Sequence, residues 1–125
     1  DMDRIGDAGH PMRVMEQITV EELYANRDDY HVLDVRGYTE HEAAHIPGAR
    51  NIHAGYLREQ IDRIPRDRTV VVHCVSGDRS SIATSMLLSE GVSNVRNLTC
   101  GFNGWSQNGY PVETGLPQDA NVLAA

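Results

Sequence analysis

The sequence predicts an α/β domain with a mostly parallel sheet, and three observations indicate it. Thr69–His73 (TVVVH) is an unbroken run of mainly β-branched residues, as in a strand that is buried on both faces of a parallel sheet. His31–Val35 and Val95–Leu98 are shorter strand-like segments, and helical patterns separate the three strands. The chain of 125 residues has the length of one ordinary domain and shows no internal repeat. We therefore expect ligands to bind beyond the carboxyl ends of these strands.

Capping and turn residues predict the helix and the strand that come before the central strand. Thr19 and Glu22 have the spacing of a capping box, which predicts a short helix over residues 20–26. After the next strand and a helical stretch, the turn Pro47-Gly48 leads into a second short strand near residues 50–52.

Further helices are predicted from apolar residues at helical spacing. One occupies the segment before Pro65, and another begins around residues 79–81 and ends at Gly91 in the C′ position. A last helix after Gly101 should carry Trp105, the only tryptophan, into the core. The buried positions expected in the first two of these helices are Leu57, Ile61 and Ile64, and then Ile82, Met86 and Leu87.

The two ends of the chain differ from its middle in composition. Residues 1–15 show no clear apolar period and contain two glycines and a proline, which is typical of a linker. Residues 115–125 are similarly small and rich in turn-forming residues. We expect a folded domain at 16–114 between a flexible N-terminal segment and a flexible C-terminal tail. Such ends fit a domain cut from a larger fusion protein, and a trimmed tag would look the same.

Charge and cysteine content restrict the partners and the compartment. With 18 acidic against 11 basic residues the net charge is −7, which has the wrong sign for binding nucleic acid or an anionic membrane. The sequence shows no leading signal peptide and no apolar run near the ~18 residues that span a bilayer. With two cysteines only, we expect a cytoplasmic protein without a structural disulfide. An anionic substrate would need a local attraction built into its site.

The loop after the central strand, Cys74–Arg79 (CVSGDR), carries the strongest chemical signal. It joins that strand to a helix at the expected ligand edge, and Gly77 lets it turn successive N–H groups inward. These groups and the positive end of the helix form a nest for an anion, so Cys74 should be a thiolate nucleophile near neutral pH. The alternative is a small buried hydrophobe, as most free cysteines are. The residues expected to form this nest and bind the substrate are Val75, Ser76, Gly77, Asp78, Arg79 and Ser80.

Several motifs together resemble those of single-domain rhodaneses, in the family's order and spacing. They are DVR at Asp34–Arg36, Glu40, HIPGA at His45–Ala49, CVSGDRS at Cys74–Ser80, then Leu98, Gly101, Trp105 and GYPV at Gly109–Val112. The resemblance implies a rhodanese-like fold, with about five parallel strands and helices on both faces. It also implies that the Cys74 loop is the active site of a sulfurtransferase, with no cofactor beyond a covalent persulfide.

In such an enzyme Cys74 takes sulfane sulfur from thiosulfate, a polysulfide or glutathione persulfide, and a thiol or cyanide acceptor removes it. Four residues separate Cys74 from Arg79. Cysteine phosphatases of the related fold have one more residue there, because a phosphate group needs a wider cradle than a sulfur atom. The short loop therefore favours sulfur over phosphate or arsenate.

Two residues depart from the commonest family pattern. Asp78 puts a carboxylate into the loop and should repel the thiosulfate dianion by about 1 kcal/mol at a wet site, which favours a persulfide donor. Alternatively Asp78 is a solvated residue paired with a nearby arginine. Cys100 stands where the family usually has glycine, on the same sheet edge as Cys74. It could resolve a persulfide or form a disulfide, and the alternative is a spectator thiol.

Two other groups of residues carry weaker signals. His41 to His45 matches the zinc motif HExxH, but the helix is short, no third ligand is evident, and His45 belongs to HIPGA, so we expect no metal. Asp34 and Arg36 could touch the substrate as auxiliary groups. Their alternative role is to tie the following loop through hydrogen bonds and a salt bridge, with Glu40 as a further partner.

The main rival from another class is a non-catalytic or persulfide-carrying module that docks to, or is fused with, a partner enzyme. The linker-like ends favour this interpretation, and the intact cysteine loop argues against an inactive module. A phosphatase or arsenate reductase and a metallopeptidase are more distant alternatives.

Overall fold

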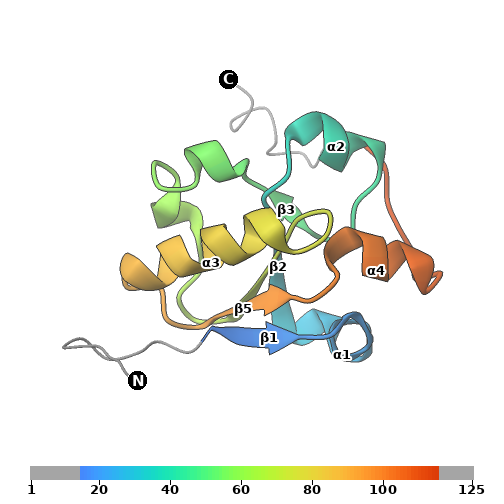
Figure 1. Cartoon of the computed structure of the whole chain (residues 1–125), viewed down its shortest axis with the longest axis horizontal. Helices are drawn as coiled ribbons and strands as arrows, with labels where there is room; N and C mark the ends of the chain where they lie inside the picture. Colours follow the sequence, from blue (N-terminus) through green and yellow to red (C-terminus); the bar gives the residue numbers. More distant parts are fainter. Residues whose placement is uncertain (1–14, 116–125) are drawn as a thin grey trace.

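A computed structural model describes residues 15–115 of the chain (Figure 1). Apart from residues 15 and 115, the two segments predicted to be flexible lie outside the described residues. No helix within 15–115 is long and apolar enough to cross a membrane.

Five parallel strands form one sheet. They are β1 (Glu16–Ile18), β2 (Tyr30–Asp34), β3 (Arg50–Asn51), β4 (Thr69–His73) and β5 (Val95–Leu98). Their order across the sheet is β1-β5-β4-β2-β3, so β4 is central, as its unbroken apolar sequence predicts. Every neighbouring pair is parallel, which confirms the predicted sheet.

Helices and 3₁₀ turns connect the strands. They are α1 (Val20–Ala25), α2 (Tyr38–Ala43), α3 (Asp78–Ser89) and α4 (Gly101–Gln107), with the 3₁₀ turns η1 (Arg27–Asp29), η2 (Ala54–Tyr56) and η3 (Ile61–Arg63). The predicted cap of α1 is present, because Thr19 Oγ1 accepts a hydrogen bond of 3.1 Å from the N–H of Glu22. The helix ends at Ala25, one residue earlier than predicted.

The two faces of the sheet carry separate hydrophobic clusters, because neighbouring residues of a strand point to opposite faces. Val70 and Val72 of β4 pack in one cluster with Leu87 of α3. Val71 packs in the other cluster with Trp105 of α4 and with residues of α1. Helices therefore cover both faces, and the site loop at the end of β4 is anchored by core on either side.

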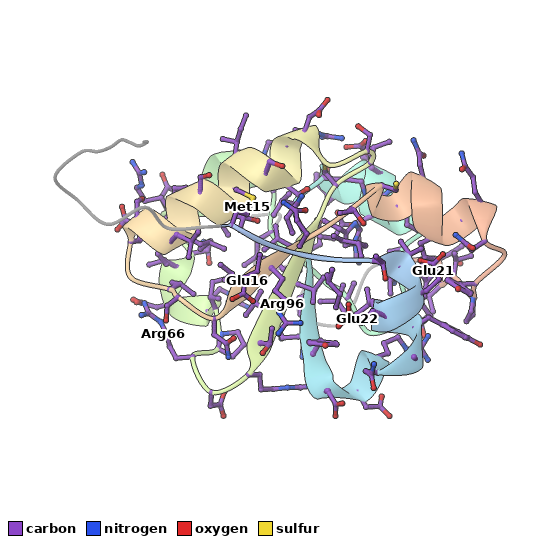
Figure 2. The ribbon with its side chains drawn as sticks, turned by 60° about the horizontal axis from the view of Figure 1, so that its bottom comes forward. Met15, Glu16, Glu21, Glu22, Arg66 and Arg96 are labelled. Atoms are coloured by element: carbon purple, nitrogen blue, oxygen red, sulfur yellow. The ribbon has the colours of Figure 1, made fainter. Side chains whose placement is uncertain are left out.

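The short edge strand β1 was not predicted from its sequence. It pairs with β5, and ion pairs join the two strands to α1: Arg96 Nε lies 3.3 Å from Glu16 Oε1, and Arg96 Nη1 lies 3.8 Å from Glu22 Oε2. Figure 2 shows Arg96 between these two carboxylates on one face of the molecule. The strand has only three residues, and the first two, Glu16 and Gln17, are polar and exposed, so its sequence shows no strand pattern.

The segment before Pro65 is not the α-helix that its apolar spacing predicts. Its turns are closed by short-range hydrogen bonds, such as that from Leu57 N to Ala54 O at 3.3 Å and that from Ile64 N to Ile61 O at 3.1 Å. A proline disfavours helical backbone at the residue before it, and Ile64 is accordingly extended. Leu57 and Ile64 are nevertheless buried, so the prediction of the inward residues was correct and that of the helix type was wrong.

Ile82 was also predicted wrongly, because its side chain is 73% exposed. The buried face of α3 instead runs through Ser80, Ala83, Thr84 and Leu87. Two of these four residues are polar, and a prediction based on apolar residues cannot place them inward. Ser80 is held there by the site described below.

We predict that shortening two side chains of α3 changes the stability of the protein by very different amounts. Leu87→Ala should lower the free energy of unfolding by about 2–5 kcal/mol, because Leu87 is fully buried against β4. Ile82→Ala should change it by less than about 0.5 kcal/mol, because the side chain is exposed. Urea unfolding measures both, and comparable losses in the two variants would contradict this assignment of the buried face.

Candidate functional site

Cys74 lies directly after β4, in the short loop that leads into α3 at Asp78. In Figure 1 this loop lies at the end of α3 nearer to α4. The cysteine is at the carboxyl edge of the sheet, where the sequence analysis placed it, and it is 1% exposed. A buried sulfur at this position depends on the loop for its polar contacts.

Three groups of the loop and of α3 surround the sulfur. Cys74 Sγ accepts hydrogen bonds from the N–H of Gly77 at 3.2 Å and from the N–H of Ser80 at 3.3 Å, and it lies 3.5 Å from Ser80 Oγ. Gly77 has φ 116°, a left-handed conformation that residues with a Cβ rarely adopt. This glycine therefore allows the loop to turn its N–H groups toward the sulfur.

These contacts favour the thiolate form of Cys74. Burial raises the pKa of the thiol, but hydrogen bonds from the Ser80 hydroxyl and from the N–H groups of Ser80, Gly77 and Ser76 outweigh burial and hold the pKa below its ordinary value. A thiol with a lowered pKa provides more of the nucleophilic thiolate at neutral pH.

A chain of hydrogen-bonded side chains lies behind Ser80, buried at Ser80 and Asn97 and exposed at its far end. Ser80 Oγ is 2.6 Å from Asn97 Oδ1 of β5, and Asn97 Nδ2 donates to Gln17 Oε1 of β1 at 3.0 Å and to Ser81 Oγ at 3.3 Å. The chain therefore runs from the sulfur across β5 to the edge strand. The sequence analysis missed Asn97 and Gln17, because only the strand order brings them beside α3.

The single hydroxyl proton of Ser80 has three nearby acceptors, which are Asn97 Oδ1 at 2.6 Å, Gly77 O at 3.2 Å and Cys74 Sγ at 3.5 Å. With a neutral thiol, Ser80 can accept from the S–H and donate to Asn97 Oδ1. With a thiolate, Ser80 donates to the sulfur, and its oxygen would then face Asn97 Oδ1 at 2.6 Å with no proton between them. The thiolate therefore competes with Asn97 Oδ1 for the Ser80 proton, because the other end of the amide, Nδ2, is held by Gln17 Oε1 and Ser81 Oγ.

The first turn of α4 fixes the backbone of the nucleophile from the other side. The N–H of Phe102 donates to Cys74 O at 2.8 Å, and the N–H of Asn103 donates to Val75 O at 2.9 Å. A Cβ on Gly101 would lie 2.6 Å from Cys74 O, so only glycine permits this close approach. Gly101 was noted in the sequence as part of a motif, and the structure gives its physical reason.

Arg79 lies at the exposed rim of the loop and binds Glu40 of α2. Arg79 Nη1 and Nη2 donate to the two carboxylate oxygens of Glu40 at 3.1 and 3.2 Å. The hydrogen bond from Arg79 lowers the pKa of Glu40, and Glu40 in turn raises the pKa of Arg79. This pair joins α2 to α3 beside the site. Asp78 is exposed and forms no ion pair with a residue of 15–115, so the arginine partner that the sequence analysis considered for it is not seen.

The guanidinium of Arg36 is held by contacts within the protein. Its guanidinium donates to Asp34, with Nη2 at 2.8 Å from Oδ2, and to Ala44 O at 2.7 Å, and it stacks on the Phe102 ring at 4.5 Å. The tie from strand to following loop is present as predicted, but Glu40 is not part of it, because that carboxylate is occupied by Arg79. An auxiliary role of Arg36 toward substrate stays a prediction.

The histidines of the HExxH match are stacked rather than convergent. Their ring centroids are 3.8 Å apart, with an angle of 7° between the ring planes. His41 Nδ1 lies 2.8 Å from Asp34 Oδ2, and His45 Nδ1 lies 2.7 Å from His41 O. Within residues 15–115 no three potential ligands are grouped to hold a metal ion.

Cys100 and Cys74 lie at the same edge of the sheet but in different environments. Cys100 is exposed and precedes α4 in a left-handed conformation, with φ 63°. Both cysteines are free thiols in this structure. A role of Cys100 in resolving a persulfide stays a prediction.

Comparison with known proteins gives one consistent family. The family model of the rhodanese-like domain matches residues 19–108. The chain is 34% identical over 96 residues to the uncharacterized protein YqhL of Bacillus subtilis, covering 77% of this chain and 76% of that protein. It is 31% identical over 94 residues to a sulfurtransferase of Allochromatium vinosum, covering 75% of this chain and 88% of the relative.

A solved structure agrees with these relatives. The crystal structure of a rhodanese-related protein from Thermoplasma volcanium is 35% identical, with a TM-score of 0.74, and the match covers 78% of this chain and 97% of that one.

We predict that Ser80 and Asn97 set the ionisation of Cys74. Ser80→Ala and Asn97→Asp should each shift the pH profile of Cys74 alkylation to higher pH, the first by removing a donor and the second by holding the Ser80 proton on a carboxylate. A rate loss of order tenfold at neutral pH corresponds to one hydrogen bond to a charged group. The measurement is the rate of iodoacetamide reaction against pH.

Asn94→Ala, at the loop before β5, is the matched control, because Asn94 bonds Thr69 at the opposite end of the sheet. Profiles of the Ser80 and Asn97 variants that coincide with that of the Asn94 variant would rule out the coupling.

Proposed function

Because the chain belongs to the rhodanese-like domain family, we propose that it is a sulfurtransferase that carries sulfane sulfur as a persulfide on Cys74. The observation that supports this most directly is that two N–H groups, of Gly77 and Ser80, donate to one buried sulfur, with the Ser80 hydroxyl 3.5 Å from it. A site built to hold a negative sulfur suits a reaction in which the nucleophile and the intermediate are both sulfur anions.

In the first step the Cys74 thiolate attacks the outer sulfur of a donor. A new S–S bond forms on Cys74 as the donor's own S–S bond breaks, and the leaving group departs with the electron pair, as sulfite from thiosulfate or as a thiolate from a persulfide. The charge moves from Sγ to the terminal sulfur of the persulfide. The inward N–H groups of the loop can stabilise both anions without a large rearrangement.

In the second step an acceptor reverses the exchange. A thiolate or cyanide attacks the terminal sulfur, its bond to Cys74 breaks, and the cysteine leaves as a thiolate. A low pKa makes Cys74 a better leaving group, so the hydrogen bonds to Sγ help this step as well as the first. No metal or organic cofactor is needed, because sulfur supplies both nucleophile and leaving group.

The size of the cradle supports sulfur rather than phosphate as the transferred group. Gly77 N and Ser80 N already reach Cys74 Sγ within 3.3 Å, and Arg79, whose counterpart grips phosphate in cysteine phosphatases of the related fold, is bound to Glu40. We therefore propose small sulfur anions and thiols as the substrates, and a cytoplasmic, reducing setting that keeps Cys74 as a thiol.

We predict that intact-mass spectrometry will show a gain of one sulfur atom after the reduced protein is incubated with glutathione persulfide or thiosulfate. The gain should be reversed by a thiol and should be absent in Cys74→Ser. Cys100→Ser is the matched control and should load as the natural chain does. No gain with either donor would overturn the proposed function, and a gain that no acceptor removes would favour a storage or carrier module.

We also predict that Asp78 sets the preference between donors. Its carboxylate is exposed at the first residue of α3 and has no ion pair to a described residue, so it adds an uncompensated negative charge beside the loop. Asp78→Asn should speed loading from thiosulfate by roughly fivefold, equivalent to about 1 kcal/mol. Loading from glutathione persulfide, whose charges are spread over a larger molecule, should change less.

Asp67→Asn is the control, because it removes the same charge at the other end of β4, where Asp67 is exposed. Equal thiosulfate rates in the two variants would mean that Asp78 is only a solvated residue.

A further inference from the structure

The edge of the sheet opposite Cys74 carries a concave region, at the amino ends of β2, β3 and β4. One hollow of about 450 Å³ is lined by His31, Arg50, Ile52, Arg63, Pro65 and Arg68. A neighbouring hollow of about 350 Å³ shares His31, Arg50 and Arg68 with it and adds Arg27. Four of the 11 basic residues of a chain with net charge −7 therefore converge on one place.

Arg68 is held in position there without being neutralised. Its Nη2 donates to the backbone carbonyls of Asp28 at 2.6 Å and Tyr30 at 3.0 Å, and no carboxylate among residues 15–115 pairs with it. Arg96 and Arg79 are different, because each faces a carboxylate (Figure 2 shows Arg96 beside Glu16). The neutral carbonyls orient the Arg68 guanidinium and leave its full positive charge directed at the hollow.

Arg27 supplies a second, independent sign of a missing anion. Its Nη1 is buried and has no hydrogen-bond partner among the described residues, although the same side chain lines the smaller hollow. A buried N–H donor without an acceptor is unfavourable and uncommon in folded proteins. The Arg27 guanidinium also forms no ion pair within residues 15–115, and an anion in the hollow that it lines would compensate its charge.

The positive charges around the two hollows also affect the pKa of His31, which lines both of them. Burial lowers the pKa of His31, and the charges of Arg50 and Arg68 lower it further. Among the residues of 15–115 that line the hollows, Asp28 of the smaller one is the single acid, and the larger one is lined by three arginines and a histidine. A negative ligand would relieve this repulsion.

We propose that this region binds a small organic phosphate, with the phosphate between Arg68, Arg27 and His31 and the organic part against Ile52 and Pro65. A tetrahedral dianion suits donors that approach from several directions, whereas a carboxylate is matched by one guanidinium fork. The apolar pair in the larger hollow gives an organic group a surface that inorganic phosphate cannot use.

This site is separate from the sulfur site. It lies at the amino ends of β2 and β4, and Cys74 follows the carboxyl end of β4, five residues away at about 3.3 Å per residue. A test of phosphate binding is therefore independent of whether Cys74 transfers sulfur.

The test is calorimetric titration of the full chain with phenyl phosphate, inorganic phosphate and acetate at constant physiological ionic strength, where loose attraction between charges is screened. We expect saturable binding of one phenyl phosphate, weaker binding of inorganic phosphate, and none of acetate. Arg68→Gln and Arg50→Gln should each weaken phenyl phosphate binding by at least about tenfold, as for a lost charged hydrogen bond.

Arg58→Gln is the matched control, because Arg58 is exposed, pairs with Glu90 and lines neither hollow. The second variant is needed because Arg68 also bonds two carbonyls, so its loss could disturb the fold locally. Equal binding by the Arg50, Arg68 and Arg58 variants, heats that never saturate, or acetate binding as tight as that of phenyl phosphate would each overturn the proposal.

Discussion

The stabilisation of a negative sulfur inside the protein is the constraint on which the rest of the site depends. Cys74 is almost fully buried, and a buried anion is costly unless hydrogen-bond donors surround it. The chain supplies them by joining the central strand β4 to α3 through a loop so short that the N–H groups of Gly77 and Ser80 point back at Sγ. Both the position of β4 and the left-handed Gly77 serve this geometry.

Neighbouring elements hold that loop in place from three directions. The first turn of α4 binds the carbonyls of Cys74 and Val75, and Glu40 of α2 binds Arg79 at the rim. Asn97 of β5 binds Ser80 from behind. The thiolate needs its donors at fixed distances, and the contacts of Ser80 with Cys74 and Asn97 explain why a polar residue occupies this core position of α3.

The sequence predicted those parts that depend on local pattern. The unbroken, mainly β-branched run placed β4 at the centre of the sheet with the bounds that the structure shows, and the order strand, glycine loop and helix placed Cys74 at the carboxyl edge. It failed where distant segments meet. Ile82 was expected inside because it is apolar, and Asn97 was overlooked because its partner Ser80 is 17 residues away. The buried face of α3 and the contact between Asn97 and Ser80 cannot be predicted before the strand order is known.

The two edges of the sheet attract anions by different means, and the direction of the backbone explains the difference. At the carboxyl edge α3 begins, so free N–H groups are available and the sulfur needs no neighbouring side-chain charge. At the amino edge the backbone around η1 offers carbonyls instead, and Arg68 binds two of them. Positive charge at that edge must therefore come from side chains, which is consistent with the concentration of arginines there in a chain that is acidic as a whole.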